Sequence, residues 1–147
     1  MPIELFFKTA TPVGVKRAAK LFKKAVSKAL GPKLSKRGIC LIFTGNSEIK
    51  KLNNKFLGRN RVTDVIAFNY PPQPGLKFEP VLGDIYVCLP QAAGQARDMG
   101  HSLLTELLIL SVHGALHLAG MDDATPALRR RMNLKTTAIL NLKSPVD

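Results

Sequence analysis

The sequence predicts an α+β fold, in which a small mixed β-sheet of about four strands packs against about five helices. Short apolar runs bounded by turn residues are typical of strands, and longer segments carry apolar residues at helical spacing. The 147-residue chain has 46% hydrophobic and 22% charged residues, which is typical of a folded domain of ordinary size. We therefore expect residues 1–147 to form a single domain.

The first half of the chain is expected to contain three strands and two helices. Thr11 and Pro12 are expected to start the first helix, which then ends at Gly31. Asn46 or Ser47 is expected to cap the second helix. The predicted strands span residues 3–7, 39–44 and 63–70, and the predicted helices span residues 11–31 and 46–58.

The second half is expected to contain one more strand and three helices. After a loop rich in proline and glycine over residues 71–80, residues 81–89 are predicted to form a strand antiparallel to the preceding one. A short helix is expected to open at Pro90, and a nearly all-apolar helix is predicted over residues 103–119. Thr125 is expected to cap the last helix.

The charge distribution indicates a polyanionic partner. The chain has 22 Lys or Arg and 10 Asp or Glu, which gives a net charge of +12. No acidic residue balances the basic residues between Leu5 and Ser47, although solvated helices normally interleave the two signs. RNA, DNA or an anionic membrane would satisfy this charge, but polar residues interrupt the most apolar segment and disfavour the membrane. The alternative is that each lysine run is only a solvated helix face.

The N-terminus and the cysteines indicate a cytoplasmic protein. The first residues, MPIELFFKTATP, lack a basic start followed by an apolar run of signal-peptide length. Two cysteines do not make a disulfide framework in a chain of this length, so Cys40 and Cys88 are expected to be buried and reduced.

The residues with the clearest chemistry lie at the end of the apolar helix. His113 and His117 are four residues apart, so both imidazoles project from one helix face and can chelate one metal ion. Gly120 lets the chain turn back, and Asp123 can then supply a third ligand. Three protein ligands leave an open coordination position, which is typical of a catalytic zinc site. The alternative is that both histidines are hydrogen-bonded core residues.

Two further residues, Gly114 and Glu106, indicate what kind of site the two histidines form. Zinc proteases place a Glu directly after the first His as the general base, and this position is Gly114 here, which disfavours a peptidase. Glu106 lies seven residues before His113, about 10 Å along the same helix. We expect Glu106 to support the site or to anchor the helix, with a buried hydrogen-bonded carboxylate as the alternative.

The segment from Glu106 to Asp123 resembles the signature of the YbeY family of endoribonucleases, the rRNA maturation factors. Further segments agree with the family in the same order, at residues 52–53, 63–68 and 82–85. The resemblance implies a metal-dependent hydrolase directed at single-stranded RNA, acting in ribosomal RNA processing and ribosome quality control. It also implies that three side chains bind zinc.

The chain departs from the commonest family pattern at two positions that matter for the site. The usual third ligand is His, where this chain has Asp123; some branches of the family carry Asp, which keeps the capacity to bind a metal. An arginine usually follows the aromatic residue aligned with Phe56, where this chain has Leu57. Arg59 or Arg61 would then contact phosphate from a shifted position. Zinc binding is therefore better supported by the resemblance than nuclease activity.

These observations define the expected site and its alternative. One zinc or similar ion per chain is expected, bound by His113, His117 and Asp123, and water bound to the metal is the only catalytic group predicted. The expected partners are single-stranded or ribosomal RNA and ribosomal subunits. The residues expected to hold RNA are Lys16, Lys20, Lys23, Arg59 and Arg61. The alternative is a non-catalytic RNA-binding or ribosome-assembly module, in which bound zinc only stabilises the last helices.

Overall fold

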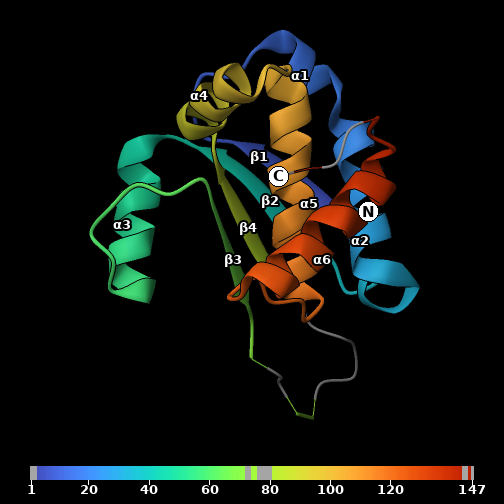
Figure 1. Ribbon diagram of the computed structural model, residues 1–147. Helices are drawn as coiled ribbons and strands as arrows, with labels where there is room; N and C mark the ends of the chain where they lie inside the picture. The colour runs from blue at the N-terminus through green and yellow to red at the C-terminus, as the bar shows by residue number, and fades with distance from the viewer. Residues whose placement is uncertain (1–2, 72–73, 76–80, 144–145, 147) are drawn as a thin grey trace.

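The computed structural model describes residues 3–71, 74–75, 81–143 and 146, and these form a four-stranded mixed sheet with six helices (Figure 1). The α+β class is therefore confirmed. The strands are β1 (Ile3–Phe7), β2 (Ile39–Thr44), β3 (Val65–Asn69) and β4 (Gly83–Cys88). The helices are α1 (Val13–Arg17), α2 (Ala19–Leu34), α3 (Asn46–Leu57), α4 (Leu89–Met99), α5 (Leu103–Leu118) and α6 (Pro126–Leu140).

The strand order of the sheet is β1-β2-β4-β3. Strands β1, β2 and β4 are parallel, and β3 is antiparallel to β4, as the sequence predicted for that pair. Alternate residues of the two central strands are fully buried and belong to the main core: Leu41, Phe43, Ile85 and Val87. The sheet therefore presents one apolar face to the helices.

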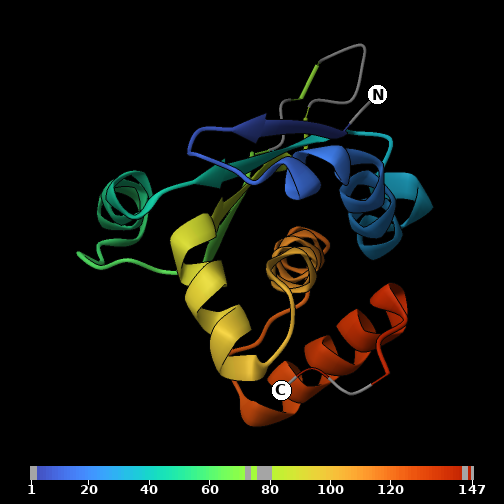
Figure 2. The same ribbon diagram turned by 90° about the horizontal axis from the view of Figure 1, so that it is seen from above.

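The helices form two further layers on that face of the sheet. Figure 2 shows α2, α5 and α4 directly against the sheet, with α6 on the far side of α5. Because α5 is surrounded in this way, most of its residues are buried, which explains its nearly all-apolar sequence. Helix α3 lies apart at the β3 side and packs through Ile49 into a smaller cluster with Ile66 and Cys88.

Two glycines let neighbouring elements approach β4 closely. A Cβ atom on Gly114 of α5 would lie 2.5 Å from Cγ2 of Ile85, and a Cβ on Gly83 would overlap the carbonyl oxygen of Phe68. Any side chain at position 114 would therefore push α5 away from the sheet. Helix–sheet packing thus explains why glycine, and not a catalytic glutamate, follows His113.

The helix boundaries differ from the sequence prediction in the first half of the chain. The helix predicted over residues 11–31 is divided at Ala18 into α1 and α2, so the described residues form six helices rather than about five. Gly31 does leave the helical conformation, with φ 86°, but helical structure resumes and continues to Leu34. Gly45 is the N-cap residue of α3, one residue before the predicted caps.

Hydrogen bonds explain which predicted caps form. Thr125 caps α6 as predicted, because its Oγ1 accepts from the backbone N–H of Leu128 at 3.2 Å. Thr11 does not cap α1, since its hydroxyl donates to the carbonyl of Thr9 at 2.9 Å. The side-chain oxygen of Asn46 accepts from the thiol of Cys88 at 3.2 Å and does not cap α3.

The two cysteines agree with the sequence prediction only in part. Cys40 and Cys88 are both free thiols, but only Cys88 is buried, because Cys40 is partly exposed on β2.

The predicted loop over residues 71–80 lies mostly outside the described residues. Among the described helices, none alone has the length and apolarity to cross a membrane; α4 and α5 pass that test only together, across a bend of 115°.

Candidate metal centre and its surroundings

The C-terminal end of α5 closes in a tight turn. The N–H of Gly120 donates to the carbonyl of His117 at 3.0 Å, and the N–H of Met121 donates to the carbonyl of Leu116 at 2.9 Å. This pair of bonds is a Schellman motif, which satisfies the last carbonyls of a helix. Gly120 has φ 100°, a conformation that other residues rarely adopt, so glycine allows the reversal that the sequence predicted.

Asp122 shapes the segment that follows this turn. Its Oδ1 accepts from the backbone N–H of Asp123 at 2.7 Å and from that of Ala124 at 3.1 Å. The carboxylate of Asp123 then lies beside His117, with 3.5 Å between Oδ2 and Nε2. Both side chains remain accessible, at 34% exposure for His117 and 46% for Asp123. The structure therefore brings together two of the three predicted metal ligands.

His113, the third predicted ligand, lies one turn earlier on α5. Its Nε2 is buried and is without a hydrogen-bond partner among the described residues. Leaving a buried polar atom unpaired costs about 1–3 kcal/mol, so such an atom indicates a position for a ligand. Burial lowers the pKa of His113 below its usual value, against the opposing charge of Asp64. The imidazole is therefore neutral at neutral pH, which is the form that binds metals.

The donor set suits zinc, although the residues are not gathered around one point. Within the described ranges, no three His, Cys, Asp or Glu side chains form a ready-made metal site. Two imidazoles and one carboxylate are nevertheless a ligand set that zinc accepts, and the unpartnered Nε2 of His113 needs such a partner. Asp123 is also close enough to His113 for its charge to raise the pKa of that imidazole, against the effect of burial.

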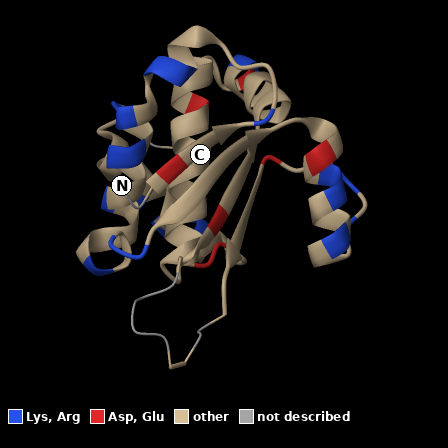
Figure 3. Cartoon of the chain, turned by 180° about the vertical axis from the view of Figure 1, so that it is seen from behind, with Lys and Arg blue, Asp and Glu red and all other residues tan. Residues whose placement is uncertain are grey.

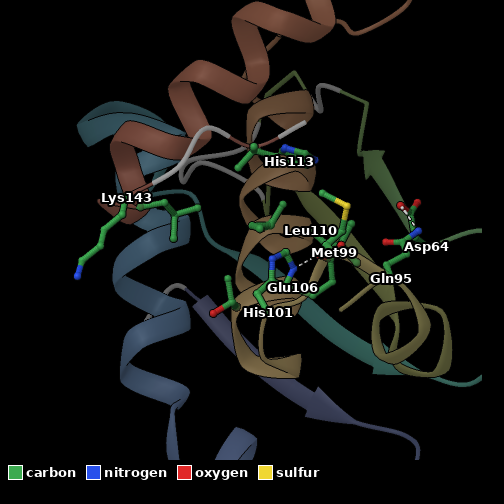
Figure 4. A pocket seen from close by; sticks show the side chains of 12 residues that line it. Asp64, Gln95, Met99, His101, Glu106, Leu110, His113 and Lys143 are labelled. Carbon is green, nitrogen blue, oxygen red and sulfur yellow. Dashed lines mark hydrogen bonds and ion pairs between the residues drawn. The ribbon is translucent and has the colours of Figure 1, made fainter. Parts of the chain in front are cut away.

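A cavity of about 630 Å³ lies beside His113 (Figure 4). Its walls come from α4, α5, the connection between them, Asp64 before β3, and three residues after α6, which are Leu142, Lys143 and Val146. At one side, Nε2 of Gln95 donates to Oδ2 of Asp64 at 3.2 Å, and the backbone N–H of Val65 donates to Oδ1 of Asp64 at 2.8 Å. No role for Asp64 or Gln95 was predictable from the sequence, because residues 31 positions apart meet only through the fold.

Glu106 lines the same cavity and anchors the start of α5. Its side chain is only 8% exposed, and its Oε1 lies 2.6 Å from Nε2 of His101 in the connection between α4 and α5. A carboxylate in the first turn of a helix also interacts favourably with the helix dipole. The contact fits a helix anchor and a simple buried, hydrogen-bonded carboxylate equally well, which are two of the roles that the sequence left open. His101 is a partner that sequence analysis missed.

The residues predicted to hold RNA fall into two separate groups. Lys16 lies on α1, Lys20 and Lys23 lie on α2, and Arg59 and Arg61 lie in the connection after α3. Helices α2 and α3 lie at opposite sides of the molecule with α5 between them in Figures 1 and 2, and Figure 3 shows basic residues on both. The structure therefore does not join the lysines and the arginines into one patch.

The lysines on α2 form a groove with additional basic residues. This groove, of about 540 Å³, is lined by Lys20, Lys23, Lys24, Lys36, Ile3, Ser27 and Ser35, and we call it the lysine groove. Among the described residues that line it, none is acidic, so the lysine groove presents concentrated positive charge. Lys16 does not line the groove, because its Nζ lies over the ring of Phe7, 5.9 Å from the centroid.

Arg59 and Arg61 are exposed, but their backbone is held in place by Asn53. Asn53 is buried on α3, and its Nδ2 donates to the carbonyl of Arg61 at 2.9 Å. Its own carbonyl accepts from the N–H of Arg59 at 3.2 Å. The connection therefore presents two exposed arginine side chains from a backbone that Asn53 holds in place.

Comparison with known proteins defines the family. The family model for endoribonuclease YbeY matches residues 6–143. An endoribonuclease YbeY from Elusimicrobium minutum is 48% identical over 142 residues, which cover 95% of this chain and 98% of the relative. The corresponding protein of Chlorobaculum tepidum is 34% identical over 135 residues, covering 92% and 93%. This chain belongs to the YbeY family, as the sequence resemblance implied.

A solved structure shows the same fold. The solution structure of TM1509 from Thermotoga maritima aligns with a TM-score of 0.62 at 27% sequence identity. The alignment covers 94% of this chain and 87% of that chain, so it includes the sheet and nearly all the helices rather than a local motif.

Proposed function

We propose that this protein is a metal-dependent endoribonuclease that cleaves single-stranded RNA, and that it acts on ribosomal RNA and ribosomal subunits in the cytoplasm, in maturation and quality control. The observation that carries this proposal is the buried, unpartnered Nε2 of His113, one helical turn from the pair formed by His117 and Asp123. The name of these relatives, endoribonuclease, supports RNA as the substrate.

His113, His117 and Asp123 would hold one zinc ion. When bound, zinc supplies Lewis acidity that activates water and polarises a phosphodiester. Burial keeps His113 neutral, so the lone pair of its free nitrogen remains available. Asp122 accepts hydrogen bonds from the backbone N–H groups of Asp123 and Ala124 and so helps to fix where the Asp123 carboxylate lies.

The basic residues would hold the RNA strand. Lysine ammonium groups bind phosphates as point charges, which suits the lysine groove, and guanidinium groups bind phosphates with paired hydrogen bonds, which suits Arg59 and Arg61. Because the two groups lie at opposite sides of the molecule, they favour an extended strand over a compact ligand.

A second candidate is a non-catalytic RNA-binding or ribosome-assembly module. It is favoured by the lack, among the described side chains, of three ligands already gathered around one point. In this module a bound ion would only hold the turn after α5 against the helix. A peptidase is not favoured, because the contact between position 114 and Ile85 leaves no room for a base there.

Cleavage assays distinguish these candidates. The purified protein, a chelated sample and a chelated sample with zinc restored are incubated with an end-labelled single-stranded RNA and with the same sequence in a duplex. We expect cleavage of the single strand that chelation abolishes and zinc restores. Cleavage that survives complete chelation would contradict the metal mechanism. Binding without cleavage in the zinc-loaded protein, across many single-stranded sequences, would favour the module.

A further inference from the structure

We propose that the cavity beside His113 binds one unpaired nucleobase of the RNA and so selects the nucleotide at which the strand is cut. This inference rests on the proposed function. The cavity lies next to the candidate metal centre, because His113 forms part of its wall. A base held there would place the adjoining phosphodiester next to the candidate metal ligands.

The size and the apolar walls of the cavity suit a base. Its volume of about 630 Å³ lies within the range of small-molecule sites and accommodates a base with its ribose. Met99, Ile109 and Leu110 supply apolar surface. Met99 is 50% exposed, and Figure 4 shows its sulfur between α5 and the pair formed by Asp64 and Gln95. Enzymes that act on a single base hold it between apolar or aromatic side chains in this way.

Gln95 supplies a polar edge that can read a base. One N–H of its amide donates to Asp64, and no other hydrogen bond engages this side chain among the described residues. Its Oε1 and its second N–H are therefore left as an acceptor and a donor side by side. Side-chain amides recognise base edges through such a pair. Asp64 fixes the orientation of the amide and is itself held by the backbone of Val65.

The opposite wall carries an imidazole in a fixed position. His101 is 27% exposed, and its contact with the buried Glu106 at 2.6 Å holds the ring in place. Histidine rings are among the surfaces on which unpaired RNA bases stack. The cavity therefore combines an imidazole on which a base can stack with the hydrogen-bonding edge of Gln95.

The charges of the cavity favour a base over a phosphate. Asp64 and Glu106 contribute carboxylates, and Lys143 is the only Lys or Arg among the described residues of the lining. Figure 4 shows the Lys143 side chain extending away from the other lining residues. An anionic phosphate would be repelled here, whereas exocyclic amino groups of bases can donate to carboxylates. The lysine groove has the opposite character, since its described lining contains four lysines and no acid.

Titration with nucleosides tests the base site separately from cleavage. Adenosine, guanosine, cytidine and uridine lack phosphate, so they do not engage the lysines. The chain has four methionines, which makes methyl NMR of labelled methionine simple to read. We expect at least one nucleoside to shift the Met99 methyl resonance in a saturable way, while the methyl of Met132, which is 1% exposed in the core, stays unchanged.

Two matched glutamine variants sharpen this test. Gln95→Ala should weaken nucleoside binding by about three- to tenfold, because one or two hydrogen bonds are lost. Gln91→Ala removes the same side chain one turn earlier on α4, outside the cavity lining, and should bind as the wild type does. If no nucleoside shifts Met99, or if Gln95→Ala binds nucleosides normally, the base site is wrong.

Sequencing the products from a pool of random single-stranded RNA gives the second readout. We expect a nucleotide preference beside the cut in the wild type and in Gln91→Ala, and a weakened preference in Gln95→Ala. An unchanged preference in Gln95→Ala would overturn the base site while leaving the proposed function intact. If the wild type binds nucleosides but cuts no RNA, the proposed nuclease function fails and the base site stands.

Discussion

The end of α5 and the lysine groove on α2 hold their polar groups in different ways. At the end of α5 the groups are few and individually placed: Nε2 of His113 is buried, His117 contacts Asp123, and Asp122 fixes the turn. In the lysine groove the ammonium groups share only their charge and their exposure to solvent. The first arrangement suits chemistry, which depends on geometry, and the second suits attachment of a polyanion. Mutations at the end of α5 should therefore impair cleavage, and mutations in the lysine groove should impair RNA binding.

The largest expected effect is that of Asp123→Ala on cleavage. Loss of a predicted metal ligand should reduce the cleavage rate by more than about 100-fold. Mutating residues that only support the ligands already lowers metal affinity or activity by about 10–100-fold. RNA affinity, which the basic residues carry, should stay within a few-fold of the wild type, as measured by filter binding. Asp123→His should bind zinc at least as well, because imidazole suits this ion.

Asp122 provides the matched control for that variant. Asp122→Asn keeps the Oδ1 acceptor that holds the turn and should retain zinc, whereas Asp122→Ala removes both hydrogen bonds and should weaken zinc binding without abolishing it. Normal cleavage by Asp123→Ala would show that Asp123 is not the third ligand.

The lysine groove should control how RNA affinity depends on salt. Neutralising Lys20, Lys23 and Lys36 to Gln should make the log–log salt slope shallower by about 2, because each phosphate contact on a single strand contributes about 0.7. Lys16→Gln is the control, since this side chain lies over Phe7 and outside the groove. Equal slopes in the wild type and the triple variant would mean that the groove is only a solvated surface.

Packing behind the candidate site should be sensitive to one methyl group. Gly114→Ala should lower the free energy of unfolding by about 1–3 kcal/mol, because the new Cβ would lie 2.5 Å from Ile85. Gly94→Ala on α4 meets only the end of the Arg97 side chain, at 3.9 Å, and should be neutral or slightly stabilising in the same chemical denaturation assay. The double variant Gly114→Ala/Ile85→Ala should lose less free energy of unfolding than the sum of the losses in the two single variants. Losses that are strictly additive would rule out the contact between position 114 and Ile85.

The smallest effect should appear in the pH dependence of metal-free protein. Burial lowers the pKa of His113 in the folded state, so the unfolded chain takes up a proton at higher pH. The free energy of unfolding should therefore fall as the pH drops below about 6.5, with a slope of at most about 1.4 kcal/mol per pH unit from this group. Denaturation of His113→Gln across the same range should show a shallower dependence, and an identical profile would exclude His113 as the source.

The sequence predicted what depends on local spacing. The i, i+4 histidines, the turn at Gly120 and the cap at Thr125 all follow from residues close in the chain, and the structure confirms the helix, the turn and the cap. Features that depend on distant partners were not predictable. Asn46 bonds Cys88 instead of capping α3, and Gln95 meets Asp64 across 31 positions.

The sequence also could not predict which lysines form the groove. Charge counting indicated Lys16, Lys20 and Lys23, but the groove also needs Lys36, which follows α2 in the chain and lies near Lys20 and Lys23 only because of the fold. Phe7, which attracts Lys16, is on a different element. Composition therefore predicted the kind of partner, and tertiary structure decided which lysines share a surface.

Zinc content is the most direct test of the central claim that His113, His117 and Asp123 bind one ion. Wild-type protein purified without chelator should contain about one equivalent of zinc or a similar ion by elemental analysis, and His117→Ala should lose it. His101→Ala removes a histidine that contacts Glu106 and no predicted ligand, so it should retain the metal. Full metal content in His117→Ala, or none in the wild type after zinc is supplied, would contradict the account.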